Sequence, residues 1–171
     1  MFWPNTIIEQ FEKYKVLKEF DLLSVDTDNY DFFMLEKILW NGYRPRVIIV
    51  EINSNFETTE AKSIMPPGDG KSWKPWDGTA YHGMSLLALS YLFNRFSYSM
   101  VWCNKINCVG VQDAALGHPL RLPVTEFNAG RLGLHPCDKT SRKMAIITPE
   151  GTFNGDTDGG QGSPYVRCKK Y

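Results

Sequence analysis

Two short apolar runs, DLLSVD at residues 21–26 and RVIIVE at residues 46–51, flank a segment with helical character. The second run is continuously apolar in its centre, which is typical of strands buried on both faces in parallel sheets under helices. Between the runs, the apolar residues of 29–41 form one helical stripe with further apolar residues beside it. Because the two connections are short, the order 21–26, 29–41, 46–52 predicts a βαβ unit with a right-handed crossover.

The size and composition of the chain exclude several classes of protein. Its 171 residues, 19.6 kDa and 43% hydrophobic content fit one domain with a real core. Nineteen basic residues balance nineteen acidic ones, which argues against a nucleic-acid partner. The longest mostly apolar stretch, 85–93, is too short to span a membrane, and residues 1–5 do not resemble a signal peptide. A reducing, cytoplasmic compartment is therefore the default expectation.

Capping patterns predict where the first two helices begin and end. Thr6 and Glu9 form a capping box, which predicts an amphipathic helix from residue 6 to about 18. Asp28 can cap the second helix, and Gly42 lies where a left-handed residue commonly follows a helix.

The region after the second strand reads as a loop, a helix and a hairpin. Residues 54–82 are rich in proline, glycine and tryptophan, which predicts an ordered loop that packs against another part of the protein. A helical stripe covers about 83–96, and strands 98–102 and 106–111 alternate around Asn104-Lys105. We expect residues 1–113 to form the α/β unit. Residues 114–171 should be an irregular, partly docked tail whose main apolar run is 144–147.

Cysteines and possible metal loops give weaker signals. Cys103 and Cys108 could face each other across the hairpin, but two small buried hydrophobic residues are the favoured interpretation. His135 and Cys137 lack further ligands at zinc spacing. Residues 154–159 match the start of a calcium loop, but position twelve is Tyr165 instead of glutamate, which favours a solvated turn.

Polar side chains follow both predicted parallel strands. Ligands of open α/β sheets bind outside the carboxyl ends of such strands. That rule selects residues 26–29, after the first strand, and Glu51 and Asn53 at the end of the second. The alternatives are that Asp28 only caps a helix and that Glu51 pairs with a lysine. For Asp26 and Glu51 a function is favoured, because buried strands seldom end in unpaired acids.

Three stretches resemble FkbM-type methyltransferases, class I enzymes that use S-adenosylmethionine. They are LLSVDTDNYDF at 22–32, RPRVIIVEIN at 44–53 and WDGTAYHGMSLLAL at 76–89. The resemblance covers roughly residues 5–112. It implies an α/β fold: a partial Rossmann-like class I methyltransferase sheet of later strands, a parallel βαβ unit followed by an antiparallel hairpin, with an irregular C-terminal tail.

The same resemblance implies roles for individual residues. Asp26, Asp28 and His82 would be catalytic, with Asp26 orienting or deprotonating the acceptor hydroxyl and His82 an alternative base. Asp26 and Thr27 would lie at the S-adenosylmethionine site. The substrate side would be formed by the following residues: Glu51, Asn53, Trp76 and Tyr81. The implied reaction in the full-length form is O-methylation of a small-molecule or sugar hydroxyl, with no metal.

The chain departs from the family pattern in ways that affect activity. Asn29 replaces a glycine and His82 replaces an aromatic residue. No glycine-rich strand–turn of the kind that holds the donor precedes Asp21. We therefore expect the chain alone to bind S-adenosylmethionine weakly or not at all. The first strand should also expose an open sheet edge, which could pair with a second copy.

Two other functions fit parts of the sequence. The D-x-D pattern of Asp26-Thr27-Asp28 also resembles the metal site of glycosyltransferases that use sugar nucleotides. A non-catalytic paralogue that binds a partner through the open sheet edge is the other alternative.

Overall fold

The computed structural model describes residues 6–65, 76, 81–127 and 144–153. Within these residues a four-stranded sheet has the order β1-β2-β5-β4, with β1 and β2 parallel and the other pairs antiparallel. Its strands are β1 (Glu19–Val25), β2 (Arg44–Glu51), β4 (Tyr98–Cys103) and β5 (Asn107–Gln112). The predicted parallel pair and the antiparallel hairpin are therefore both present in a mixed, open α/β sheet.

The helices that accompany the four-stranded sheet differ from the predicted helices mainly in where they begin and end. They are α1 (Ile7–Lys13), α2 (Asp31–Trp40) and α3 (Leu86–Arg95), with the short α4 (Asp113–Leu116) and the 3-10 turn η1 (Val124–Phe127). The predicted capping box is wrong, because the Thr6 side chain makes no capping hydrogen bond. The first helix is also shorter than predicted, since Lys15 adopts φ 53°, a left-handed conformation that α-helices do not contain.

Ser85 sets the start of α3. Its backbone is extended, and its hydroxyl accepts a hydrogen bond from the Ala88 N–H, so the helix begins three residues later than the apolar pattern suggests.

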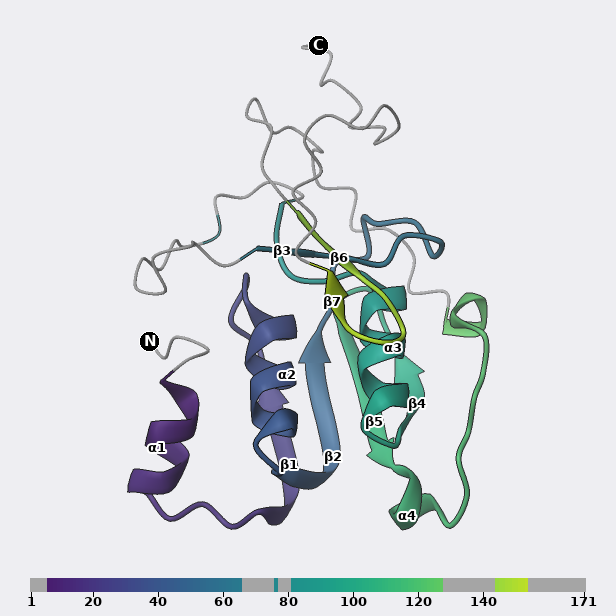
Figure 1. Cartoon of the computed structure of the whole chain (residues 1–171). Helices are drawn as coiled ribbons and strands as arrows, with labels where there is room; N and C mark the ends of the chain where they lie inside the picture. The colour runs from purple at the N-terminus through teal and green to yellow at the C-terminus, as the bar shows by residue number, and fades with distance from the viewer. Residues whose placement is uncertain (1–5, 66–75, 77–80, 128–143, 154–171) are drawn as a thin grey trace.

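The core lies between the sheet and the helices on one of its faces. Figure 1 shows α2 and α3 in front of the strands, and their buried side chains share one cluster with those of β2 and β5. On the other face Leu22 is 55% and Trp102 is 52% exposed, while Val47 and Ile49 are only partly buried. The prediction that the second strand, now β2, is buried on both faces is therefore wrong, since α2 and α3 cover only one side.

A second, three-stranded sheet was not predicted. It consists of β3 (Lys62–Ile64), β6 (Met144–Ile147) and β7 (Thr152–Phe153), which pair antiparallel in the order β3-β6-β7. Figure 1 shows this sheet beyond the carboxyl end of β2. The segment 54–82 thus contains a strand, and the apolar run at 144–147 is its partner. The predicted division of the chain at residue 113 stays a prediction.

Arg95, on α3, links α2 to the second sheet. Its guanidinium contacts the Glu36 carboxylate on α2 at 3.0 Å and donates to the Thr148 carbonyl, just after β6, at 3.1 Å. Both charged side chains are mostly buried, so this contact holds the second sheet against the helices.

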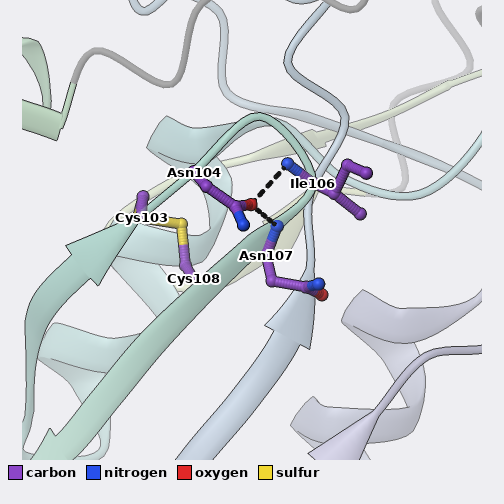
Figure 2. The surroundings of a disulfide bond; sticks show 5 residues. All are labelled: Cys103, Asn104, Ile106, Asn107 and Cys108. Carbon is purple, nitrogen blue, oxygen red and sulfur yellow. Dashed lines mark hydrogen bonds between the residues drawn. A yellow bond between two sulfur atoms is a disulfide. The ribbon is translucent and has the colours of Figure 1, made fainter.

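Cys103 and Cys108 form a disulfide bond across the β4–β5 hairpin, as Figure 2 shows. The antiparallel register places the two residues directly opposite each other. In the turn between them, the Asn104 side-chain oxygen accepts hydrogen bonds from the backbone N–H groups of Ile106 and Asn107 at 2.8 and 2.6 Å. The favoured prediction of two unlinked hydrophobic residues is therefore wrong.

β1 is an edge strand of the four-stranded sheet. Over the described ranges its only paired neighbour is β2, so the open edge that the sequence predicts is present. None of the helices in the described part of the chain has the length and apolar character needed to cross a membrane.

Candidate functional site

Three carboxylates meet where β1 and β2 end. The parallel register pairs Val25 with Val50, so Asp26 and Glu51 leave the sheet side by side. One carboxylate oxygen each of Asp26, Asp28 and Glu51 lies within 4.8 Å of the other two. Asp26 and Asp28 are exposed, whereas Glu51 is half-buried. The predicted meeting of Asp26 and Glu51 at one rim is confirmed.

The turn that carries Asp26 and Asp28 is organised by Thr27 and Asp31. The Asp31 carboxylate accepts hydrogen bonds from the Thr27 N–H at 2.7 Å and from the Thr27 hydroxyl at 3.0 Å. The Thr27 hydroxyl in turn accepts the N–H of Tyr30 at 3.2 Å. Thr27 therefore has a structural duty at the start of α2, while its predicted contact with the donor stays a prediction.

Asp28 does not cap α2, so the alternative that Asp28 only caps a helix is wrong. Tyr30 occupies the cap position, and Asp28 adopts φ 61°, a left-handed conformation that aspartate and asparagine tolerate better than most residues. The turn thereby brings the Asp28 carboxylate to Asp26 and Glu51 instead of the helix end.

Burial and neighbouring negative charge raise the pKa of two acids of the site, Glu51 and Asp31. Burial, together with the charges of Asp31, Asp26 and Asp28, raises the pKa of Glu51 to about 8. Burial raises the pKa of Asp31 to about 6, although its hydrogen bonds from Thr27 oppose this shift. Among the described residues no lysine or arginine forms an ion pair with these acids, so the predicted alternative of a Glu51–lysine pair is wrong.

Asn53 is completely buried just beyond β2. Its side-chain nitrogen donates to the His82 carbonyl at 2.8 Å, and its side-chain oxygen accepts from the N–H and amide of Asn55 at 3.0 and 2.9 Å. These contacts join the end of β2 to the segment before α3. The predicted contact of Asn53 with an acceptor stays a prediction.

The side chains of His82 and Trp76 lie together. Their rings are 5.3 Å apart, and His82 is 3% exposed, with no hydrogen-bond partner for Nε2 among the residues described. Burial lowers the pKa of His82, while the charge of Asp28 acts in the opposite direction. Tyr81 is half-buried and packs against a small cluster that contains Tyr30, Ile64 and Met144.

Asp31 is the site residue that sequence reasoning missed. It belongs to the quoted motif DTDNYD and follows Thr27 by four residues, which was the available signal. The zinc idea at His135 and Cys137 and the calcium-loop idea at 154–165 fall outside the described residues.

The chain was compared with protein families, curated proteins and solved structures. No family model, no curated protein and no solved structure matches it.

Proposed function

We propose that this chain carries the acceptor side of an S-adenosylmethionine-dependent O-methyltransferase site. The observation that carries the proposal is the meeting of Asp26 and Glu51 at the carboxyl ends of two neighbouring parallel strands. Ligands of open α/β sheets bind at such a rim. The sequence resemblance adds the chemistry, namely methyl transfer to the hydroxyl of a small molecule or sugar.

The side chains at this rim suit the handling of a hydroxyl group. Methyl transfer requires the acceptor oxygen to be lined up with the sulfonium and its proton to be accepted. Asp26 is exposed and can orient the hydroxyl or accept its proton. Glu51, whose pKa is raised to about 8, can hold a proton near neutral pH and donate a hydrogen bond to the same oxygen. His82 and Tyr81 would close the pocket, with His82 as an alternative base.

The test is transfer of a radiolabelled methyl group from S-adenosylmethionine to a panel of hydroxyl-bearing small molecules and sugars. The protein should be expressed from its complete transcript. We expect transfer that Asp26→Asn abolishes and that Asp21→Asn leaves unchanged, because Asp21 is an exposed acid on the same strand. Transfer by the wild type that is unaltered in Asp26→Asn, or no transfer to any acceptor, would contradict the proposal.

A separate titration addresses the donor. The resemblance covers only the later half of the methyltransferase fold, so calorimetry of this chain with S-adenosylhomocysteine should give weak or no binding. Micromolar binding would refute that expectation.

A D-x-D glycosyltransferase is the second candidate. It is favoured by the close approach of Asp26, Asp28 and Glu51, which matches a site for a metal ion and a sugar diphosphate. Affinity for a sugar nucleotide that depends on Mn²⁺ would favour this candidate over methyl transfer.

The non-catalytic alternative rests on β1, whose outer edge is unpaired among the described residues. In that case the chain would associate through this edge, and a second copy would serve as the partner. Size-exclusion chromatography at rising concentration tests it, and a monomer at all concentrations would contradict it.

A further inference from the structure

Among the residues that the structure describes, no lysine or arginine forms an ion pair with the acids at the ends of β1 and β2. In the described ranges there are four ion pairs, and they involve other acids: Asp21, Glu60, Glu36 and Asp113. Like charges brought this close repel one another unless a proton or a cation neutralises them. A cation bound between these carboxylates would relieve that repulsion.

Two buried carboxylate oxygens, one on Glu51 of the cluster and one on Asp31, also lack a hydrogen-bond partner among the described residues. Asp31 is 0% exposed, and its Oδ2 has no hydrogen-bond partner in the part of the chain that is described. Glu51 Oε2 is likewise buried and unpartnered there. The other oxygen of Asp31 accepts hydrogen bonds from Thr27, which lies between Asp26 and Asp28, so both buried oxygens belong to one acidic neighbourhood. Buried polar atoms without a partner are uncommon and call for an explanation.

The spacing of the cluster matches one coordination sphere. Hard divalent cations bind oxygen ligands at about 2.0–2.6 Å, so two ligand atoms on opposite sides of one ion lie about 4–5 Å apart. The oxygens of Asp26, Asp28 and Glu51 fall within 4.8 Å of one another, which allows all three to contact a single ion. A set of carboxylates suits Mg²⁺, Mn²⁺ or Ca²⁺ better than the softer transition metals.

We propose that Asp26, Asp28 and Glu51 bind one divalent cation that prefers oxygen ligands. Asp31 strengthens the site through its charge and is a positioning residue that also holds the turn through Thr27. The proposal does not depend on methyl transfer, because the ion is inferred from the charges and contacts alone.

Manganese is the probe, since free Mn²⁺ is measured directly by its paramagnetic resonance signal. The full chain is titrated with Mn²⁺ at pH 7.5, and Mg²⁺ and Ca²⁺ are then added as competitors. We expect one saturable site, displaced by at least one of these two ions. Asp28→Asn should weaken Mn²⁺ binding at least tenfold. Asparagine keeps the size of the side chain and tolerates the left-handed backbone of this position, so the turn should persist.

Asp21→Asn is the matched control, because it removes an exposed acid from the same strand, and its affinity should equal that of the wild type. Glu51→Gln is the second variant, and circular dichroism checks that each variant is folded. No saturable binding by the folded wild type, or equal affinity in the wild type and in a folded Asp28→Asn or Glu51→Gln, overturns the proposal.

Discussion

The side-chain amide of Asn53 donates a 2.8 Å hydrogen bond to the backbone carbonyl of His82, which lies 29 residues further along the chain. Asn53 is 0% exposed, and its oxygen also accepts two hydrogen bonds from Asn55. One side chain therefore ties the backbone just after β2 to the segment before α3.

Asn53→Ala should lower the free energy of unfolding by about 1–3 kcal/mol, because it leaves buried backbone groups without partners. Denaturation in urea measures the change. Asn41→Ala is the control, since Asn41 makes a similar side-chain bond to the Lys37 carbonyl but is exposed. Equal losses in the two variants would show that the buried position of Asn53 is not what matters.

Gly110→Ala should be destabilising because β5 and α3 approach each other closely. A Cβ atom at Gly110 would lie 2.5 Å from two ring atoms of Phe93, which is 1% exposed and cannot move freely. Overpacking of this kind costs about 1–3 kcal/mol. Gly151→Ala is the control, since nothing lies within 4 Å of its Cβ position. A melting temperature for Gly110→Ala equal to that of the control would contradict the packing argument.

Glu51 should make stability fall as the pH rises from 7 to about 8.5. Its pKa is about 8 in the folded chain and 4.5 as a free side chain, so in this window only the folded state keeps the proton. Raising the pH therefore favours unfolding, and the effect levels off above the folded pKa. Asp31 and His82 add little here, because the pKa of Asp31 is about 6 and that of His82 lies below 6.5.

The measurement is urea denaturation at several pH values in EDTA, which removes divalent cations. Glu51→Gln should reduce the fall in stability over this window. The same pH dependence in wild type and variant would mean that another group is responsible.

The disulfide should stabilise the hairpin modestly, because the loop that it closes is short. For about six residues the loss of chain entropy in the unfolded state corresponds to about 2 kcal/mol. We expect the double variant Cys103→Ser/Cys108→Ser to be less stable than the wild type by about this amount. Reductant should lower the stability of the wild type by opening this disulfide, and it should have no such effect on the hairpin of the variant. Mass spectrometry without reduction should find the two cysteines in one linked peptide. Free thiols at both positions in the purified chain would contradict this.

The parts of the fold that the sequence predicted have strong local signals. β1, α2 and β2 follow one another with short connections, and their apolar patterns are long enough to identify each element. β3 has three residues and pairs with β6 far along the chain, so its stability comes from a partner that local patterns do not reveal. The right register for Cys103 and Cys108 was also visible, but spacing alone does not say whether two facing thiols are oxidised.

The candidate site also has residues that could be predicted from the sequence and one that could not. Asp26 and Glu51 could be predicted because the ends of parallel strands meet by geometry. Asp31 was missed because it lies inside a helix pattern, where a single acid looks like an ordinary residue of the first turn. Its importance comes from complete burial, which depends on packing between distant segments.

The long separation between β3 and β6 affects how the molecule opens. Ser63 pairs with Ala145, so this contact closes a far larger loop of chain than the β4–β5 hairpin does. Closing a large loop costs more entropy, and contacts of this kind form slowly. The backbone amides of β6 should therefore exchange with deuterium through a partial opening that leaves β1 and β2 protected.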